Sequence, residues 1–485
     1  MKRLKAGLII PHPEDQKWDN VWKIFRFPNL TLPTLAALFP EEEWDIEIQD
    51  ELVAPLDFTR GYDLVLITVT TSVAIKAYEV ARIFRQAGAQ VILGGIHPSA
   101  LPQEAARHAD AVVIGEAESV MSRLLEDFKN NRLAKFYTMP GMADRWDRRL
   151  PRWDLLDPKG YLFRESLTAT RGCNYRCKFC SIHLALGGGQ YGYRKKPVAE
   201  VVAILEKIHS PLIMFWDDDL LSDPRYTREL CQALRPLGKK WMSQMSATYV
   251  AQHPEMLKLL AAGGCSAMFM GLESVDQESL TSVNKQNSAK NYETLIHRIQ
   301  AVGIDVHAGF VSGLDHEDVF SFERTVEWGN RVGLCGAIWR VLTPYPGTQL
   351  FEEFRRAGRL LTTDWTAYSG EHVVFRPARM TPEELYWGHK WAKRQFYSYR
   401  SIGQRMLRRA KLQGAGELLN TFGTGVGYRA MFRIPSQERD VDVYRDRKHL
   451  PPQPIPVAYR FPYVRHSNWK HKILNHLADY LPVGA

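Results

Sequence analysis

Apolar, strand-like runs alternate with amphipathic helical patterns along most of this 485-residue chain. The runs are rich in β-branched residues, and the patterns between them carry apolar residues at three- and four-residue spacing. Strands that alternate with helices form parallel sheets covered by helices. The chain is therefore predicted to be an α/β protein, and the two series of runs described next predict two sheets.

The first series occupies residues 1–135 and predicts a doubly wound, Rossmann-like parallel sheet. Its strand-like runs are LKAGLII (4–10), WDIEIQDEL (44–52), YDLVLITVTTS (62–72), AQVILGG (89–95) and ADAVVIG (109–115). Gly94, Gly95, Gly115 and Glu116 follow predicted strand ends, which is where ligands bind in such sheets. No GxGxxG opens a helix, so a dinucleotide site is disfavoured.

The second series occupies residues 161–365 and predicts a partial (β/α)6 barrel of the TIM type. Its strand-like runs are SLTATRGC (166–173), PLIMFW (211–216), KKWMSQM (239–245), GCSAMFMGLE (264–273), GIDVHAGFVS (303–312) and CGAIWRVL (335–342). Polar residues at two of these strand ends, Asp217–Asp219 and Glu273–Ser274, are candidate ligand contacts. The structural alternatives are helix capping by Asp218 or Asp219 and a salt bridge at Glu273.

Two further segments flank the predicted barrel. Residues 136–160 are rich in Pro, Arg and Trp and are expected to be an irregular linker. Residues 366–485 are expected to form a mainly helical, basic region, in which Thr381 and Glu384 would make a capping box. From residue 401 onward there are fourteen Lys and Arg against six Asp and Glu, out of a net charge of +9 for the whole chain. Residues 194–196 (Arg-Lys-Lys) are expected to be a solvated entry to a helix.

Three of the six cysteines, Cys173, Cys177 and Cys180, fall within eight residues. A disulfide framework is disfavoured because such frameworks characterise small secreted domains, and the N-terminus lacks a secretory signal pattern. A tetrahedral zinc site would need a fourth ligand, for which His183 is the nearby candidate. Three thiolates fit better with an iron–sulfur cluster that leaves one iron open to a non-protein ligand. Cys231, Cys265 and Cys335 are expected to be structural.

The spacing CxxxCxxC at residues 173–180 resembles the signature of the radical S-adenosylmethionine (SAM) superfamily. The segments DDDLLSD (217–223), MGLES (270–274), VSGLDHED (311–318) and TPYPGT (343–348) resemble family signatures in the same order. The resemblance covers about residues 160–360. It implies that the cysteines hold three irons of a [4Fe–4S] cluster whose fourth iron binds SAM. It further implies SAM contacts for Phe179, Asp217, Asp218, Glu273 and Ser274.

Residues 3–130 resemble the cobalamin-binding domain that precedes the barrel in one radical SAM class. The matching segments are TVTTS (68–72), GGIHPSALPQEA (94–105) and ADAVVIGEAES (109–119). Cobalamin domains that ligate cobalt through a histidine carry the motif DxHxxG after the first strand. This chain has PHPEDQKW (11–18) at that place, so neither His12 nor His97 is expected to bind cobalt. The implied cobalamin contacts are Thr68, Thr70, Thr71 and Ser72 beneath the corrin, Gly94 and Gly95 at the nucleotide tail, Gly115 and Glu116. The alternative is a domain that kept the fold and lost the cofactor.

The combined resemblance implies a cobalamin-dependent radical SAM enzyme that methylates an unactivated carbon of a small-molecule or lipid-like substrate. The alternatives are oxidative cyclisation or ring rearrangement without methyl transfer, and a non-catalytic corrinoid- or SAM-binding regulator. An electron donor such as flavodoxin or ferredoxin is the expected partner. No nucleic-acid partner is expected, whereas the basic C-terminal region could contact a membrane surface. With no apolar run long enough to span a membrane, a cytoplasmic location is expected.

Overall fold

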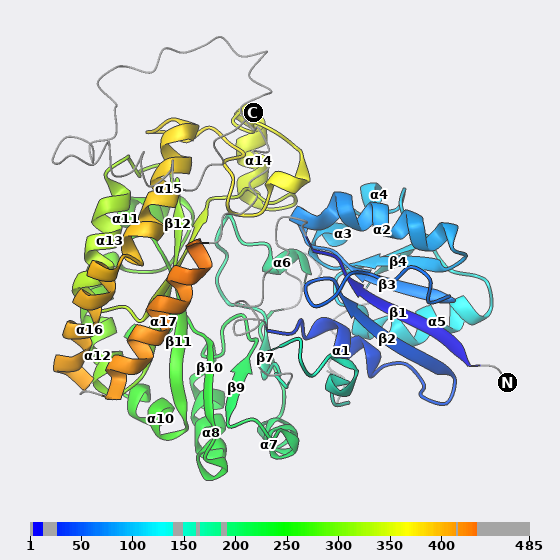
Figure 1. Ribbon diagram of the computed structural model, residues 1–485, viewed down its shortest axis with the longest axis horizontal. Coiled ribbons are helices and arrows are strands. Elements are labelled where there is room, and N and C mark those ends of the chain that lie inside the picture. Colours follow the sequence, from blue (N-terminus) through cyan, green and yellow to red (C-terminus); the bar gives the residue numbers. More distant parts are fainter. Residues whose placement is uncertain are drawn as a thin grey trace.

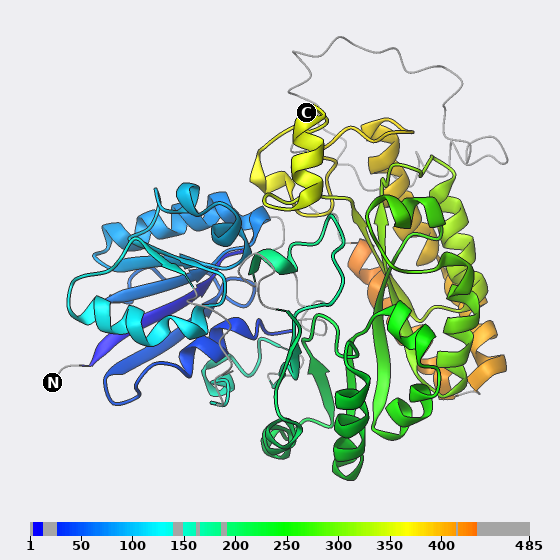
Figure 2. The same ribbon diagram turned by 180° about the vertical axis from the view of Figure 1, so that it is seen from behind.

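The computed structural model describes residues 3–12, 27–138, 149–161, 165–185, 192–413 and 416–433. Figure 1 shows two α/β bodies side by side, the N-terminal one in blue and the barrel in green, with helices α15, α16 and α17 against the barrel. Figure 2 shows the same arrangement from behind. The predicted architecture, a parallel sheet followed by a partial barrel and a helical region, is confirmed.

The N-terminal sheet has six parallel strands in the order β2-β1-β3-β4-β5-β6. The strands are β1 (Leu4–Ile10), β2 (Trp44–Asp50), β3 (Leu64–Thr68), β4 (Gln90–Gly94), β5 (Ala111–Ile114) and β6 (Phe136–Thr138). The apolar core on one face includes helix α2 (Ala74–Gln86). The core on the other includes α1 (Thr31–Ala36) and α5 (Met121–Lys129). The sheet is thus doubly wound, and its strand order reverses between β1 and β3, where such sheets bind ligands.

The barrel half contains a five-stranded parallel sheet in the order β13-β12-β11-β10-β9. Its strands are β9 (Leu212–Phe215), β10 (Lys240–Gln244), β11 (Cys265–Glu273), β12 (Asp305–Ser312) and β13 (Gly336–Val341). The first predicted strand, 166–173, contributes only an isolated parallel bridge between Leu167 and Phe215. After it, β7 (Thr170–Arg171) pairs antiparallel with β8 (Arg194–Lys195). The strand ends early because the backbone N–H groups of Ala169 and Thr170 donate to the Asp217 carboxylate instead.

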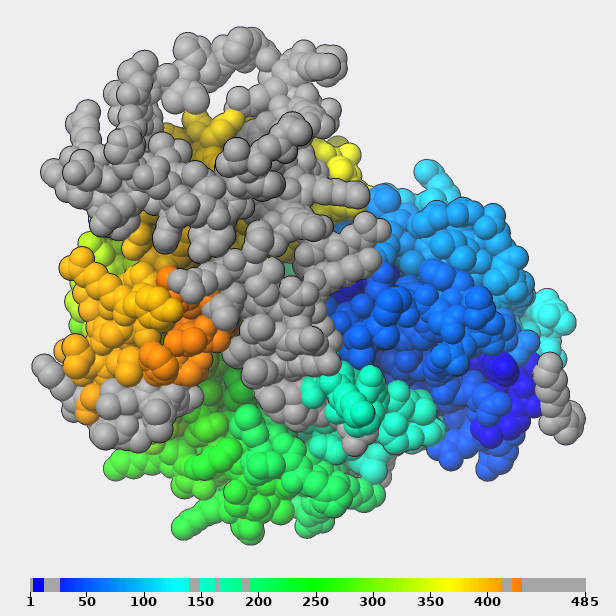
Figure 3. Space-filling model, viewed as in Figure 1, coloured from blue at the N-terminus to red at the C-terminus, as the bar shows by residue number. Residues whose placement is uncertain are grey.

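Helices cover the outer face of the barrel sheet. They are α7 (Val198–Lys207), α8 (Pro224–Leu234), α9 (Ala247–Gln252), α10 (Met256–Ala262), α11 (Gln277–Ser282), α12 (Tyr292–Ala301), α13 (Ser321–Val332) and α14 (Gln349–Arg356). Residues Cys231, Cys265 and Cys335 are buried, as expected of structural cysteines. Figure 3 shows the N-terminal body (blue) on one side of the molecule and the barrel (green) with the helices that follow it (orange) on the other.

Three helices follow the barrel: α15 (Pro382–Phe396), α16 (Tyr399–Gln413) and α17 (Gly416–Arg433). The predicted capping box of α15 is present, with Thr381 and Glu384 each accepting a hydrogen bond from the other's backbone N–H. The buried Arg409 of α16 forms an ion pair with Asp305 at the start of β12. The part of the basic region beyond residue 433 lies outside the described residues. Within the described part of the chain, no helix is long and apolar enough to cross a membrane.

Candidate functional site

The three clustered cysteines lie on a loop between β7 and the short helix α6 (Ile182–Ala185). All three are partly buried, and none forms a disulfide. Burial raises the pKa of Cys173 to about 12 and that of Cys180 to about 11, so the unliganded thiols are protonated at neutral pH. Iron would therefore bind with release of these protons. Phe179, the residue before the last cysteine, packs against the barrel core.

Neighbouring segments hold this cysteine loop in place. The Gly172 N–H donates to Asp218 Oδ2 over 2.8 Å, next to the first cysteine. The Lys178 N–H donates to the Val283 carbonyl oxygen over 3.0 Å, and the Asn284 side-chain amide donates to the Arg176 carbonyl oxygen over 2.8 Å. The loop is thus bonded to the end of β9 and to the segment after α11, which fixes its backbone without using any thiol.

The donor set fits an iron–sulfur cluster better than a single metal ion. Among the described residues, no group of three or more His, Cys, Asp or Glu side chains is arranged to hold one ion. The thiolates of a cluster bind different irons, so their sulfurs do not need to converge on one point. His183, the candidate fourth zinc ligand, has its Nε2 2.8 Å from the Tyr175 carbonyl oxygen, to which it must donate.

The three aspartates after β9 have different surroundings. Asp217 is buried and accepts hydrogen bonds from the backbone of Ala169 and from the Thr170 hydroxyl, and its burial raises its pKa to about 7. Asp219 is buried and accepts from the Ser222 hydroxyl (2.7 Å) and the Ser246 N–H (2.9 Å). Asp218 accepts from Gly172 through one oxygen, and its other oxygen accepts no hydrogen bond from the described residues. Asp218 is thus the aspartate with spare capacity for a ligand.

The N-cap expected at Asp218 or Asp219 is found elsewhere. Asp223 caps α8, and its Oδ1 accepts hydrogen bonds from the N–H groups of Arg225 (2.9 Å) and Tyr226 (3.1 Å). Capping by Asp218 or Asp219, the structural alternative to a ligand contact, does not occur, because the segment 220–223 separates them from the first helical residue, Pro224. The aspartates at 217–219 are consequently not consumed by helix capping.

Glu273 and Ser274 follow β11, beyond a register shift in its pairing with β12. Glu273 has a φ of 65°, a left-handed conformation that is uncommon for a non-glycine residue. Its Oε1 accepts a hydrogen bond from Lys285 Nζ over 2.8 Å, which is the salt bridge considered as the structural alternative. The Ser274 hydroxyl donates to Glu317 over 2.7 Å, and burial raises the Glu317 pKa to about 7.

Lys285 is a site residue that the sequence did not reveal. It is largely buried beside the cysteine loop, where it lies in the electrostatic field of Glu273 and of Cys177. Its ammonium group is paired with Glu273, and it would also offset negative charge on the thiolates of Cys177 and Cys173. In the sequence, Lys285 is a single lysine three residues after α11, and nothing distinguishes it from a lysine that is exposed to solvent.

The expected cobalamin contacts lie along the carboxyl edge of the N-terminal sheet. Thr68 ends β3, Thr70 is exposed, and Thr71 is buried at the start of a short 3-10 turn. Ser72, within that turn, is partly buried. This segment lies beside the reversal point between β1 and β3, so the structure places it where a bound ligand is expected.

The glycines at this edge have separate structural roles. Gly95 has a φ of 105°, and a Cβ there would lie 2.9 Å from the Val69 carbonyl oxygen, so the fold itself requires glycine. A Cβ on Gly94 would meet only Val113 Cβ, at 3.7 Å, which leaves room beside it. Gly115 has a φ of 85°, and its N–H donates to Ser99. A side chain as small as alanine would therefore fit at Gly94 but not at Gly95.

Both histidines considered as cobalt ligands are bonded to protein groups. His12 Nε2 lies 3.0 Å from Asp50 Oδ1. His97 is fully buried, and its Nε2 lies 3.1 Å from the Tyr78 hydroxyl and 3.2 Å from Glu104. Burial lowers the pKa of His97, so its imidazole is neutral near pH 7. These contacts agree with the expectation that neither residue ligates cobalt.

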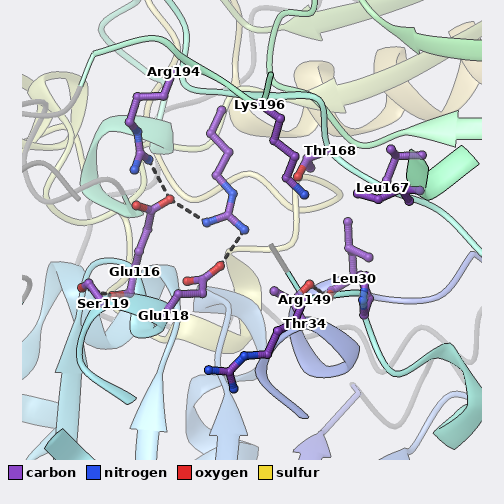
Figure 4. Close-up of a pocket in the computed structure, with 13 residues that line it drawn as sticks. Leu30, Thr34, Glu116, Glu118, Ser119, Arg149, Leu167, Thr168, Arg194 and Lys196 are labelled. Atoms are coloured by element: carbon purple, nitrogen blue, oxygen red, sulfur yellow. Dashed lines mark hydrogen bonds and ion pairs between the residues drawn. The ribbon is translucent and has the colours of Figure 1, made fainter. Parts of the chain in front are cut away.

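Glu116 faces the barrel. Its Oε1 lies 2.8 Å from Arg171 Nη1 and 2.7 Å from Arg194 Nη2. Figure 4 shows Arg194 pointing toward the Glu116 carboxylate. Glu118 binds the other side of Arg171 over 2.6 Å. Arg194 was expected to be solvated, but its side chain is only 11% exposed because it is paired with Glu116. The small cavity beside these groups, about 40 Å³, has room for one or a few water molecules and none for a cofactor.

Comparison with known families matches both bodies of the chain. Residues 25–125 match the B12 binding domain, and residues 167–329 match the Radical SAM superfamily. The chain is 29% identical over 384 residues to the bacteriochlorophyllide d C-12(1)-methyltransferase of Chlorobaculum tepidum, covering 77% of this chain and 83% of that protein. It is 25% identical over 370 residues to the anaerobic magnesium-protoporphyrin IX monomethyl ester cyclase of Rubrivivax gelatinosus, covering 70% and 66%.

A solved structure shares the whole arrangement. The radical SAM methyltransferase TsrM from Kitasatospora setae, with cobalamin and a [4Fe-4S] cluster bound, superposes with a TM-score of 0.64 at 15% identity. The alignment covers 89% of this chain and 100% of that one. At this identity the likeness establishes a common fold.

Proposed function

The chain is a radical SAM enzyme that carries a B12-binding domain, and we propose that it methylates an unactivated carbon of a small-molecule or lipid-like substrate. The observation that supports the proposal is the direct contact between β7, which leads into the cysteine loop, and the ligand-binding edge of the N-terminal sheet, made by Arg171, Glu116 and Glu118. Such a contact would bring a cluster on the cysteine loop close to a corrinoid on the edge of the sheet. Electrons would come from a donor such as flavodoxin or ferredoxin.

The cysteine loop would hold a [4Fe–4S] cluster through Cys173, Cys177 and Cys180. With SAM on its fourth iron, such a cluster supplies a radical able to remove a hydrogen atom from unactivated carbon. Asp218, whose second oxygen accepts no hydrogen bond from the described residues, would accept the positively charged amino group of SAM. The Lys285 ammonium, paired with Glu273 beside the cysteine loop, would offset part of the negative charge of the thiolate ligands.

The N-terminal sheet would hold cobalamin, which supplies a methyl group when bound. Thr68, Thr70, Thr71 and Ser72 would lie beneath the corrin ring, and the backbone at Gly94, which carries no side chain, would let the nucleotide tail approach closely. Because His12 is paired with Asp50 and His97 with Tyr78, neither histidine would ligate the cobalt. Glu116, also expected to be a cobalamin contact, pairs with Arg171 and Arg194 in the contact between the domains.

A second function, oxidative cyclisation without methyl transfer, is favoured by the similarity to the cyclase of Rubrivivax gelatinosus. The cysteine loop and the hydrogen-abstracting chemistry would be the same. The two functions differ in whether the methyl group of SAM ends on the substrate carbon.

This difference gives the test. The reconstituted protein is incubated anaerobically with a reductant, SAM bearing a deuterated methyl group, and either bacteriochlorophyllide d or a lipid extract. Methyl transfer predicts a product that carries the deuterated methyl group, detected by mass spectrometry. An unlabelled product that has lost two hydrogen atoms would support the cyclase function. Cleavage of SAM with neither product from either pool would overturn the assignment of these substrate classes.

A further inference from the structure

We infer that Arg171 is a positioning residue that sets the N-terminal domain against the cysteine loop and thereby couples SAM cleavage to methyl transfer. The coupling rests on the proposed function, whereas the positioning of the domains does not. Arg171 lies two residues before Cys173, on β7. Its partners Glu116 and Glu118 lie just beyond the carboxyl end of β5, on the ligand-binding edge of the other domain.

The geometry of this contact favours one orientation of the two domains. Arg171 Nη1 lies 2.8 Å from Glu116 Oε1, and Arg171 Nη2 lies 2.6 Å from Glu118 Oε1. A guanidinium is planar, so two carboxylates bound to its two terminal nitrogens fix its direction as well as its position. Arg194 approaches Glu116 from β8 over 2.7 Å, so two arginines face two glutamates. Figure 4 shows Glu116, Glu118 and Arg194 side by side.

The contact is shielded from solvent. The side chains of Glu116 and Glu118 are 10% and 20% exposed, and that of Arg171 is 25% exposed. Partly buried charge pairs are screened little by salt, and removing one partner leaves the other charge without compensation. The ion pairs between Arg171 and the two glutamates therefore resist sliding of one domain on the other more than exposed ion pairs would.

The same residue is directly connected to the cofactor loop. The next residue, Gly172, has a φ of 88° and donates its N–H to Asp218, the aspartate with spare capacity. A shift of Arg171 would therefore move the backbone that enters the cysteine loop. Transfer between two bound groups requires their reacting atoms to be held to within about 0.5 Å, so a small domain displacement would uncouple the steps.

A second contact between the domains provides a matched control. Trp365 Nε1 donates to the Glu104 carboxylate, over 3.0 Å to one oxygen and 3.2 Å to the other. Trp365 packs in the same apolar cluster as helix α2 of the N-terminal domain. This contact joins the same two bodies without touching the cysteine loop.

The experiment compares wild type with three single variants, Arg171→Ala, Arg171→Lys and Arg171→Glu. It also includes a charge-swapped double variant, which combines Arg171→Glu and Glu118→Arg, and the control variant Trp365→Phe. Iron and cobalamin contents are measured first, in the full chain reconstituted anaerobically. Hydrogen exchange of residues 115–119 and 169–172 is then followed in the cofactor-free chain. Finally, the ratio of 5′-deoxyadenosine to methylated product is determined.

We expect Arg171→Ala to keep its iron and cobalamin, to exchange faster in both segments, and to raise the ratio about tenfold or more. Arg171→Glu should raise the ratio further, and the charge swap should reverse part of that rise. The ratio for Arg171→Lys should lie between those of Arg171→Ala and wild type. Trp365→Phe should leave the ratio unchanged. Unaltered exchange in Arg171→Ala, or loss of its iron, would overturn the inference. If wild type makes no methylated product, the proposed function fails, and the exchange data still decide the positioning role.

Discussion

Cys173, Cys177 and Cys180 differ from the other three cysteines in their accessibility. They are partly exposed on a loop, whereas Cys231, Cys265 and Cys335 are buried in the barrel half. We expect the triple Cys→Ala variant of the loop to bind essentially no iron after anaerobic reconstitution, against about four irons per wild-type chain. The measurement is iron and sulfide content per chain.

The three buried cysteines are the control for this prediction. Replacing each one with Ala should leave iron content and SAM cleavage close to wild type, since none lies on the cysteine loop. Iron that persists in the triple loop variant, or iron lost on changing a buried cysteine, would refute the assignment of the cluster ligands.

His97 tests the lower face of the proposed cobalamin site. Its Nε2 contacts Tyr78 and Glu104, and its ring packs 5.5 Å from that of Trp365. We expect His97→Ala to leave the absorption spectrum of bound cobalamin in its base-off form, as we also expect for His12→Ala. The free energy of unfolding should fall by about 1–3 kcal/mol, because buried partners of the imidazole lose a hydrogen bond. A wild-type spectrum of histidine-ligated cobalt that disappears in either variant would contradict this account.

At the scale of elements, helix α15 is held by a charge cluster in which Lys393 and His389 are buried and Glu371 is partly buried. Glu371 accepts from Lys393 Nζ at 2.6 Å and from Arg340 at 2.7 Å, and His389 Nε2 lies 3.5 Å away. Burial, reinforced by Lys393, lowers the pKa of His389 to about 3. Its imidazole is therefore neutral in the folded protein and protonates below about pH 6.5 in the unfolded chain.

This difference makes stability depend on pH in a defined window. Below pH 6.5 the unfolded state binds a proton that the folded state does not, so the free energy of unfolding falls as the pH drops toward 3. The contribution of His389 at pH 5 is a loss of about 2 kcal/mol relative to pH 7. We expect the free energy of unfolding of His389→Phe to fall by about 2 kcal/mol less than that of wild type between pH 7 and pH 5, as measured by denaturant titration at both pH values. An identical pH dependence in the variant and wild type would contradict the assignment.

The elements that sequence patterns predicted best are those built from long apolar runs. All five expected strands of the N-terminal sheet are present, as is the capping box at Thr381. The three-residue strand β6 was missed because so short a run carries no periodicity. The length of the first barrel strand was overestimated. Asp217, 47 residues or more away along the chain, accepts the backbone N–H groups of residues 169–170, which therefore do not pair with a strand of the barrel. Local patterns do not contain such contacts.

At the scale of the whole molecule, the contact between the domains was the least predictable feature. Glu116 was assigned to a cofactor and Arg194 to solvent, yet the two bind each other across 78 residues of sequence. An isolated charged residue gives no indication of its partner when the partner is on another domain. The cysteine loop could be found because its ligands are close in sequence, whereas Lys285 and Arg171 acquire their roles only through folding.

In the proposed function, one chain holds an iron–sulfur cluster on its barrel and cobalamin on its N-terminal sheet. The most direct test is elemental analysis of iron and cobalt in the full-length protein, after anaerobic reconstitution with iron, sulfide and hydroxocobalamin and removal of unbound material. The account predicts about four irons and an equimolar amount of cobalt per chain, with the cobalt retained in the triple Cys→Ala variant that has lost the iron. Iron without cobalt in wild type would contradict the account, leaving a B12-type fold that no longer binds its cofactor.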